Sequence, residues 1–323
     1  MTHRAAWPAR AVVSAALVGV SFVASTFVGV ESAAGQGRSS APAAWTPPRT
    51  PDGHPDLQGI WDFRTATPLE RPRDFAGKEF FTPEEAAQWE DRNAERIAGI
   101  IAVHPPSWLD YGMKLLPDLR TSLIVDPPGG HVPALTPDGQ KRATARAQKA
   151  RRVPEGPEDL TVQERCLVFS AGPPIVPGPY NNNLQIVQTP AAVVVMTEMI
   201  HDARIVPLDG RPHLAPAVRR WLGDSRGSWK GDTLVVETTN FTSQTPFRGS
   251  DENLTVTERY TRTGPDTLSY EFTIDDPTAF ASPWTVAFPM ARSSEQMYEY
   301  ACHEGNYGLL DTLKGARYEE QKK

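Results

Sequence analysis

The chain has 323 residues, a formal net charge of −6 and a hydrophobic content of 39%, which includes eight tryptophans. This is enough apolar material for a sizeable core, in one large domain or two smaller ones. The acidic balance argues against nucleic acid or an anionic membrane surface as the main partner. Thirty-one prolines and 24 glycines favour many short elements joined by turns.

The first 34 residues have the pattern of an export signal. Arg4 and Arg10 give a positive start, and residues 11–30 form an apolar run of mostly small residues. Residues 32–34 are a small-x-small cleavage site, so we expect processing after Ala34 and a periplasmic or secreted protein. The apolar run is also long enough for an uncleaved anchor, which leaves both fates open. After cleavage we expect no membrane association.

Residues 35–54 are rich in Gly, Ser, Ala and Pro and predict a flexible leader. From 55 to 323 we expect a single domain with a helical insertion around 82–152. Its first helix begins with Thr82 as N-cap, Pro83 at the first helical position and Glu85 completing a capping box. A second helix over 136–152 begins in the same way. Its few apolar residues predict a surface position.

The remaining elements are predicted to be short antiparallel strands. β-branched or alternating patterns mark residues 55–62, 184–188, 192–197, 203–208, 233–239, 254–262, 267–274, 284–290 and 296–302. The segments 254–262 and 267–274 predict a hairpin with one buried and one exposed face. Strands and helices do not alternate after residue 181, which argues against a parallel sheet. We therefore predict an all-β fold, a closed or nearly closed antiparallel barrel with two N-terminal helices as decoration.

The two cysteines, Cys166 and Cys302, both follow the predicted export signal. An even cysteine count in an exported chain predicts a disulfide bond, and with two cysteines its pairing is unambiguous. The alternative is two buried free thiols.

Residues 221–241 form the most distinctive stretch of the chain. Within it, residues 223–227 match G-x-S-x-G, the pattern of a nucleophile elbow, with Ser225 at the nucleophile position. That motif requires a serine between a strand and a helix. Because a β-branched strand follows here, we interpret the segment as a glycine-rich turn in which Asp224 and Ser225 bond backbone groups.

The densest polar cluster lies between two predicted strands and supplies the candidate catalytic residues Glu198, His201 and Asp202. In extended backbone Glu198, Asp202 and Arg204 share one face, whereas in a turn His201 and Asp202 converge. A histidine fixed by a carboxylate is a common general acid or base. Arg204 would bind an anionic substrate group or pair with Glu198. The competing interpretation is a buried ion-pair network between strands.

Four further residues are candidates for substrate binding: Asn182, Trp221, Trp229 and His303. Asn182 lies among three consecutive asparagines, which suit a turn or a polyhydroxylated ligand. The two tryptophans would form apolar walls. His303 follows Cys302 and would be held by the disulfide, or would simply cap a strand end. Neither metal-ligand spacing nor a nicotinamide or flavin signature is present, so we predict no metal and no cofactor.

Motifs along most of the chain carry a resemblance to known proteins. They occupy residues 55–61, 165–166, 185–190, 205–212, 221–229, 231–238, 256–259, 274–277, 283–285 and 299–302. Together they resemble a large family of exported proteins from soil-type bacteria, most of them called hypothetical. This resemblance implies export and no particular reaction. The Gly59-x-Trp61 start and the meandering strands are also similar to lipocalin-type barrels, so the expected barrel is lipocalin-like (calycin-type).

We therefore expect an exported small-molecule enzyme, a lyase or hydrolase, that uses metal-independent acid–base chemistry in a barrel pocket. The alternative is a non-catalytic ligand-binding barrel, and a third possibility is a wall-associated interaction protein with a large exposed apolar patch. An enzyme should gather Glu198, His201 and His303 around one cavity. A binding protein should scatter them and hold Glu198, His201 and Arg204 in structural pairs outside a closed apolar cavity. The oligomeric state stays open.

Overall fold

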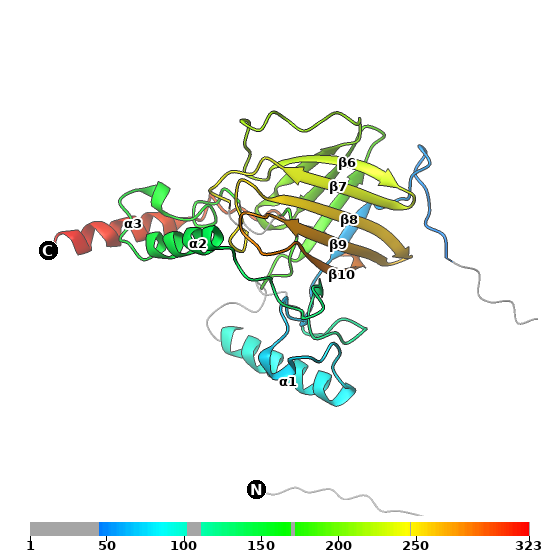
Figure 1. The fold of residues 1–323 in the computed structure, drawn as a ribbon, viewed down its shortest axis with the longest axis horizontal. Coiled ribbons are helices and arrows are strands. Elements are labelled where there is room, and N and C mark those ends of the chain that lie inside the picture. The colour runs from blue at the N-terminus through cyan, green and yellow to red at the C-terminus, as the bar shows by residue number, and fades with distance from the viewer. Residues whose placement is uncertain (1–44, 102–110, 169–171, 246, 323) are drawn as a thin grey trace, which may run out of the picture. The chain divides into compact units, whose positions relative to one another are not determined.

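The structure is a computed structural model that describes residues 45–101, 111–168, 172–245 and 247–322. The predicted export signal and most of the predicted leader lie outside these ranges. The described residues form a sheet of ten strands and three α-helices (Figure 1). The helices are α1 (Pro83–Ile101), α2 (Pro137–Ala150) and α3 (Tyr307–Glu320). The strands are β1 (Gly59–Asp62), β2 (Ile124–Asp126), β3 (Asn183–Gln188), β4 (Ala192–Thr197), β5 (Ala203–Pro207), β6 (Asp224–Lys230), β7 (Thr233–Thr239), β8 (Thr255–Gly264), β9 (Thr267–Asp275) and β10 (Trp284–Ser293).

The predicted antiparallel sheet is confirmed, but its hydrogen-bonded path does not close. The strands follow the order β5-β4-β3-β1-β10-β9-β8-β7-β6, and β2 pairs with β10 beside this path. Every neighbouring pair is antiparallel, so in a path of nine strands the two end strands run in the same direction. An antiparallel pairing of β5 with β6 is therefore impossible. Within the described residues, the expected barrel is an open curled sheet.

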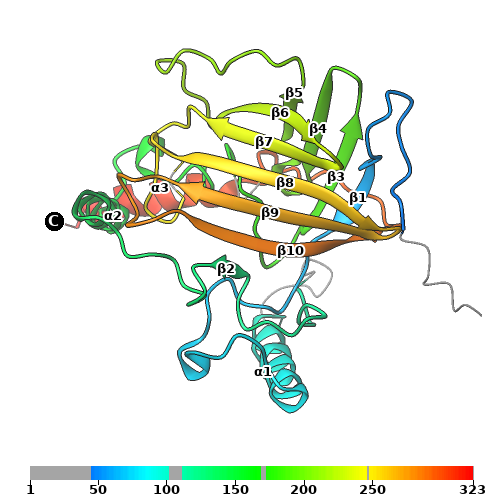
Figure 2. The same cartoon turned by 45° about the vertical axis from the view of Figure 1, so that its right-hand side comes forward.

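The curl brings β5 opposite β8 across an enclosed interior. In Figures 1 and 2, β3 and β4 cross obliquely behind β7 and β8. The guanidinium of Arg204 on β5 forms an ion pair with Glu258 on β8. Aromatic side chains with at most 2% of their surface exposed fill the rest of this interior: Trp61, Tyr260, Tyr270, Phe272, Trp284 and Phe288. Buried positions alternate with more exposed ones along β8 and β9, as the sequence pattern predicts.

Gly227 allows the two end strands to pack without hydrogen bonds between them. A Cβ atom built on Gly227 of β6 would lie 2.8 Å from Val206 Cγ1 and 2.7 Å from Leu208 Cδ2. These are the side chains at the end of β5 and just after it. A larger residue than glycine would therefore push β5 and β6 apart.

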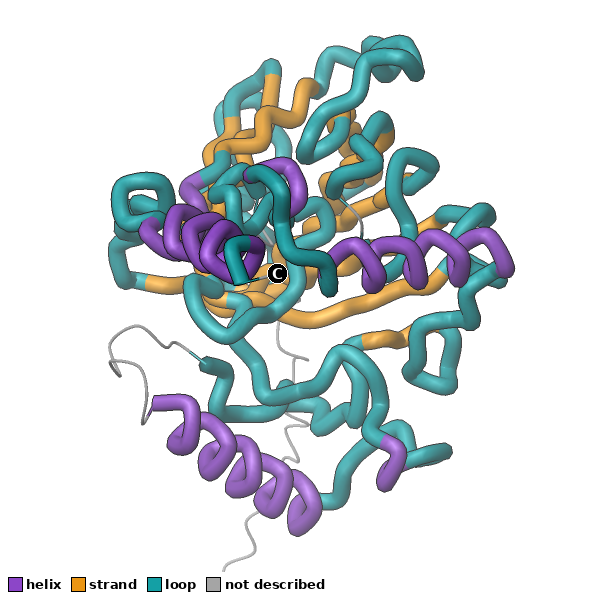
Figure 3. The backbone as a smooth tube through the Cα atoms, turned by 90° about the vertical axis from the view of Figure 1, so that its left-hand side faces the viewer, coloured by secondary structure: helices purple, strands orange, loops and turns teal. Residues whose placement is uncertain are grey.

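Two of the three helices are confirmed predictions. In α1 the capping box is formed, because Thr82 N–H donates to Glu85 Oε2 at 2.8 Å and Glu85 N–H to Thr82 Oγ1 at 3.3 Å. In α2 the Thr136 hydroxyl accepts a hydrogen bond from Gly139 N–H at 3.0 Å. All three helices lie outside the sheet (Figure 3). No helix of the described part of the chain is long and apolar enough to cross a membrane.

The predicted disulfide bond between Cys166 and Cys302 is confirmed. It joins the segment before β3 to the segment before α3, across 136 residues of sequence. Such a bond is consistent with an oxidising, extracytoplasmic setting.

The strand predicted over residues 296–302 is wrong, and α3 follows where no helix was expected. Both sides of β10 are already paired, with β1 and β9, so a strand that follows β10 has no free edge beside it. The Asn306 side chain accepts from Leu309 N–H and caps α3 instead. Arg317 then anchors this helix to the backbone oxygens of Pro154 and Glu155.

Replacing Gly227 with alanine should lower the free energy of unfolding by about 1–3 kcal/mol, because the new methyl group overpacks the contact with Val206 and Leu208. Urea unfolding followed by tryptophan fluorescence measures this change. Gly129→Ala is the matched control, since a Cβ at Gly129 has no neighbour within 4 Å. Equal stability of the two variants would contradict the close packing of β5 against β6.

Candidate functional site

A cleft of about 780 Å³ lies where β5 and β6 fail to pair. One wall is β5 with the residue before it, Asp202, and the other is the segment 221–226 that leads into β6. Leu167 and Val168, next to the disulfide, form a third side. We call this hollow the seam cleft. Its lining combines apolar residues with six charged ones: Asp202, Arg204, Arg219, Arg220, Asp224 and Arg226.

A tight turn between β4 and β5 presents Asp202 to the seam cleft. Ile200 and His201 in this turn have left-handed backbone conformations, with φ of 61° and 46°. A β-branched residue rarely adopts this conformation, and it persists only where the surroundings hold it. The Ile200 side chain is 7% exposed, so its burial anchors the turn. Backbone strain of this kind is concentrated at functional sites.

Asp202 carries a carboxylate oxygen that the described residues leave unused. Its Oδ2 is buried and has no hydrogen-bond partner among them. Burial raises the pKa of Asp202 above its ordinary value, and the neighbouring His201 opposes this shift. The site therefore favours the protonated acid more than water does.

Arg204 belongs to a buried network inside the sheet. It is 6% exposed and forms a two-pronged ion pair with Glu258, in which Nη2 lies 2.9 Å from Oε1 and Nη1 contacts Oε2. The hydroxyl groups of Tyr260 and Tyr270 donate to Glu258 at 2.7 and 2.9 Å. Burial alone would lower the pKa of Arg204, but the attraction of Glu258 outweighs it and raises that pKa. Arg204 is thus permanently charged and fixed in orientation.

One donor of Arg204 stays free. Its Nε–H is buried and has no acceptor within the described chain, although Arg204 lines the seam cleft. Asp202 and Arg204 lie two residues apart on the same wall, but no ion pair joins them there. An unsatisfied buried donor costs about 1–3 kcal/mol, so a ligand that supplies an acceptor recovers this free energy.

The rim of the seam cleft is cationic. Arg219 and Arg220 are exposed and line it, and neither forms an ion pair with a carboxylate among the residues described. Arg219 donates only to the backbone oxygen of Glu252. Arg226, in contrast, is paired with Asp224 at 2.9 Å.

His213 fastens the segment between β5 and β6 that carries this rim. Its Nδ1 lies 3.1 Å from Asp224 Oδ2 and its Nε2 lies 3.1 Å from Glu237 Oε1. Asp224 also accepts a hydrogen bond from the backbone N–H of Leu214 at 2.9 Å. Asp224 therefore serves to position the cleft wall rather than to face a ligand.

The seam cleft brings together three of the eight site residues named from the sequence: Asp202, Arg204 and Trp221. The predicted catalytic partners lie elsewhere. Glu198 accepts a hydrogen bond from Asn183 Nδ2 at 2.8 Å and does not pair with Arg204. His201 is exposed, and its Nδ1 lies 3.2 Å from the Tyr300 backbone oxygen.

The other predicted substrate-binding residues are also dispersed. The Asn182 side chain is 1% exposed and bonds both the N–H and the oxygen of Gly178, which closes a turn. Trp229 lies at the far end of β6, where its ring stacks on His54 with centroids 4.8 Å apart. His303 is exposed in the loop before α3. The interpretation of residues 223–227 as a glycine-rich turn is wrong, because β6 begins at Asp224 and Ser225 bonds the side-chain hydroxyl of Thr238 across to β7. The G-x-S-x-G segment forms no nucleophile elbow.

The acceptor of the buried network, Glu258, was not identified from the sequence. A signal was present, because Glu258 occupies an inward position between Val256 and Tyr260 in an alternating strand. Its partner Arg204 is 54 residues away in the chain, which hides their pairing.

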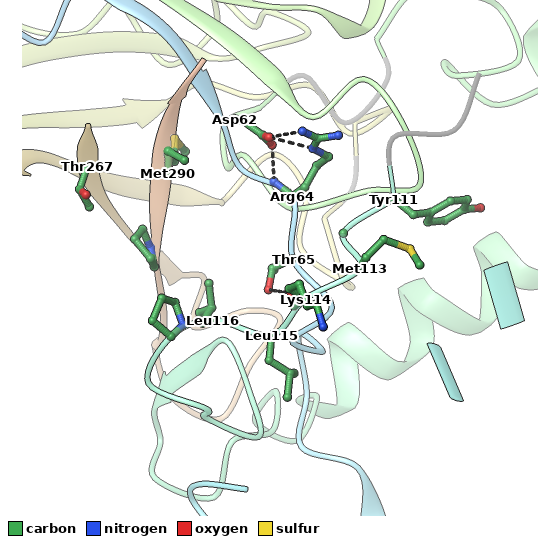
Figure 4. A pocket seen from close by; sticks show the side chains of 14 residues that line it. Asp62, Arg64, Thr65, Tyr111, Met113, Lys114, Leu115, Leu116, Thr267 and Met290 are labelled. Carbon is green, nitrogen blue, oxygen red and sulfur yellow. Dashed lines mark hydrogen bonds and ion pairs between the residues drawn. The ribbon is translucent and has the colours of Figure 1, made fainter. Parts of the chain in front are cut away.

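A second hollow, of about 480 Å³, lies outside the sheet between the end of β10 and the segment 111–117 (Figure 4). Its charged side chains have partners: Asp62 accepts from Arg64 Nε at 2.8 Å, and Lys114 donates to Glu90 at 2.6 Å. None of the site residues named from the sequence lines this hollow. It therefore offers a ligand fewer free polar groups than the seam cleft does.

No protein-family model matches the chain, and the comparison with curated proteins also finds no match. The function is therefore argued from the geometry of the site. Over the described ranges, no three His, Cys, Asp or Glu side chains are grouped in a way that would hold a metal ion.

Replacing Glu258 with glutamine should lower the free energy of unfolding by about 3–5 kcal/mol, because it leaves the buried charge of Arg204 without a counterion. The exposed pair Arg259–Glu271, with nitrogen and oxygen 3.4 Å apart on the outer face of the same strands, gives the control. Glu271→Gln should change stability by no more than about 1 kcal/mol. Adding Arg204→Met to Glu258→Gln should recover part of the loss. Similar effects of the two glutamine variants would contradict a buried network.

Replacing Asp202 with asparagine should raise the stability at pH 7 by less than about 1 kcal/mol, because this half-exposed carboxyl is harder to ionise in the folded state than in the unfolded state. As the pH falls towards 3.8, the ordinary pKa, the parent protein therefore becomes more stable relative to Asp202→Asn. The difference in stability between the two proteins should disappear there. Thermal unfolding from pH 3 to 8 measures the difference.

Asp209 is the control of opposite sign. A hydrogen bond from Arg211 lowers the pKa of Asp209. Asp209→Asn should therefore be less stable than the parent protein at neutral pH. The difference in stability between the two proteins should disappear at acidic pH. If the stability of the parent protein and that of Asp202→Asn change with pH in the same way, the pKa of Asp202 is not raised.

Proposed function

We propose that the protein is a small-molecule-binding protein whose ligand occupies the seam cleft. The observation that carries this proposal is the free Nε–H of Arg204, a buried donor in the wall of a cleft of about 780 Å³. Apolar walls with a few fixed polar groups are typical of ligand sites. We further propose that the curled sheet is related to lipocalin-type barrels, with its ligand at the open seam instead of in the lumen.

The placement of the polar residues supports binding over catalysis. Glu198 and His201 are held by hydrogen bonds to Asn183 and to the backbone of Tyr300, away from Arg204. His303 is exposed on a different loop. This scatter matches one part of the arrangement expected of a binding protein. The other part does not match, because buried aromatic side chains fill the interior in place of a closed apolar cavity, and Arg204 lines the seam cleft. Because aromatic side chains fill the interior, the proposed ligand binds in the seam cleft and not inside the sheet.

An extracytoplasmic location fits this function. The disulfide between Cys166 and Cys302 supports an oxidising compartment, either the periplasm or the exterior. The export pattern of the N-terminus and the resemblance to exported bacterial proteins support the same location.

A second candidate function is an enzyme in which Asp202 acts as a general acid. It is favoured by one observation: burial raises the pKa of Asp202 while its Oδ2 has no partner among the described groups. A carboxyl group in this state keeps its proton to a higher pH than an ordinary aspartic acid does, and it can donate that proton to a leaving group. Hydrolysis of phenyl acetate, whose basic phenoxide leaving group gains from protonation, above background and lost in Asp202→Asn would favour the enzyme. Background hydrolysis in both proteins favours the binding protein.

The neutral dye N-phenyl-1-naphthylamine should bind the protein with enhanced fluorescence, because its apolar rings fit the walls of the seam cleft. Ile205 lines the cleft and is 64% exposed, so Ile205→Trp should fill the cleft without unfolding the sheet and should weaken binding at least about tenfold. A fluorescence titration measures both affinities.

Val187→Trp is the matched control, since Val187 is 41% exposed on β3 and does not line the seam cleft. This variant should bind the dye like the parent protein. The proposed function is overturned if the dye does not bind, or if it binds Ile205→Trp and Val187→Trp equally well.

A further inference from the structure

We propose that the ligand of the seam cleft is an anion with an apolar body, whose carboxylate or other oxyanion group binds the Nε–H of Arg204 and the guanidinium groups at the rim. This inference rests on the proposed function and specifies the chemical class of its ligand.

The seam cleft is cationic on a protein whose formal net charge is −6. Four arginines line it: Arg204, Arg219, Arg220 and Arg226. The carboxylates of Asp224 and Glu258 neutralise Arg226 and Arg204. Arg219 and Arg220 keep their charge without a carboxylate partner in the described chain. An anion is therefore attracted to this cleft although the protein as a whole repels it.

Arg204 has one edge of its guanidinium left for a ligand. Both of its terminal nitrogens contact Glu258, and the Nε–H has no acceptor within the described part. A planar guanidinium offers donors on more than one edge, so it can bind a second oxyanion while the first pair stays intact. Because Glu258 already fixes the orientation, binding at this edge costs little conformational entropy.

Asp202 would repel an anion if it were ionised. Its carboxyl lies on the same wall as Arg204, and burial raises its pKa above the ordinary value. A protonated Asp202 can donate to the oxyanion through its free Oδ2, whereas an ionised one opposes binding. The charged group that acts on its pKa is His201, and the cleft that it lines also contains Asp224 and the four arginines. Anion binding should therefore take up a proton and weaken as the pH rises.

The apolar walls set the second requirement on the ligand. Leu167, Val168, Ile205, Trp221 and Leu222 line the cleft around the charged groups. A small inorganic anion would leave this surface in contact with water. An amphipathic anion covers the surface and satisfies the donor of Arg204 at the same time.

Two dyes with the same aromatic body test this inference. The dye 8-anilinonaphthalene-1-sulfonate is N-phenyl-1-naphthylamine with an added sulfonate group. We expect the sulfonate to bind about tenfold more tightly than the neutral dye at low ionic strength, because only the sulfonate can accept charge-assisted hydrogen bonds from the arginines. This advantage should shrink as salt is added. Ile205→Trp should weaken both dyes, which shows that both occupy the seam cleft.

Arginine variants identify the groups that bind the sulfonate. Arg220→Ala, at an exposed position, should reduce the advantage of the anionic dye and leave the neutral dye unchanged. Arg204→Met combined with Glu258→Gln, which removes the buried charges together, should reduce it further in protein that circular dichroism shows to be folded. Arg259→Ala is the control, because Arg259 lies on the outer face of β8 away from the cleft. It should behave like the parent protein.

The pH dependence gives an independent readout, because a sulfonate stays ionised between pH 4 and pH 8 in ordinary aqueous solution, at roughly unit negative charge. The affinity for the anionic dye should fall as the pH rises, and Asp202→Asn should remove this dependence.

The outcomes separate the two proposals. Failure of the neutral dye to bind overturns the proposed function. Binding of the neutral dye without preference for the anionic one overturns only the anionic class. The anionic class is also overturned if Arg220→Ala and the Arg204/Glu258 double variant both keep the full preference for the anionic dye. In that case the anion binds elsewhere.

Discussion

The ion pair between Arg204 and Glu258 is the interaction on which the rest of the structure depends. It joins β5 to β8 across the interior and therefore fixes how far the sheet curls. Glu258 also accepts from Tyr270, whose hydroxyl in turn accepts from Ile175 N–H at 3.0 Å, so the segment before β3 is held by the same network. A buried ion pair adds little net stability but is costly to break. Its role here is to specify one arrangement of strands and one orientation of Arg204.

The open seam follows from the number of strands in the hydrogen-bonded path. Nine alternating strands bring two parallel edges together, and β5 and β6 share no backbone hydrogen bonds in the described structure. At one end Gly227 allows them to pack through Val206 and Leu208. The seam cleft lies along the same edge and is lined by Asp202, Arg204 and Pro207 on the side of β5. The same geometry that leaves the sheet incomplete thus creates the cleft in which we propose that a ligand binds.

The sequence predicted those elements that local chemistry determines. Capping residues such as Thr82 located α1 and α2, and alternation located most strands and the β8–β9 hairpin. Alternation was misleading at residues 296–302, because a strand also needs a free partner. For the cleft, the polar cluster over residues 198–204 was a local signal, but only Asp202 and Arg204 of its named residues line the cleft, and Glu198 and His201 do not. Glu258 was not identified, because only the curl of the sheet brings β8 to β5.

The most direct test of this account is the Nε–H resonance of Arg204 in a ¹H–¹⁵N spectrum, assigned by its loss in the Arg204→Met, Glu258→Gln double variant. The account predicts a signal that is protected from exchange with water, shifts when 8-anilinonaphthalene-1-sulfonate is added, and shifts much less with the neutral dye. A resonance that stays unchanged while the anionic dye saturates the protein would contradict the assignment of Arg204 as the free donor of the seam cleft.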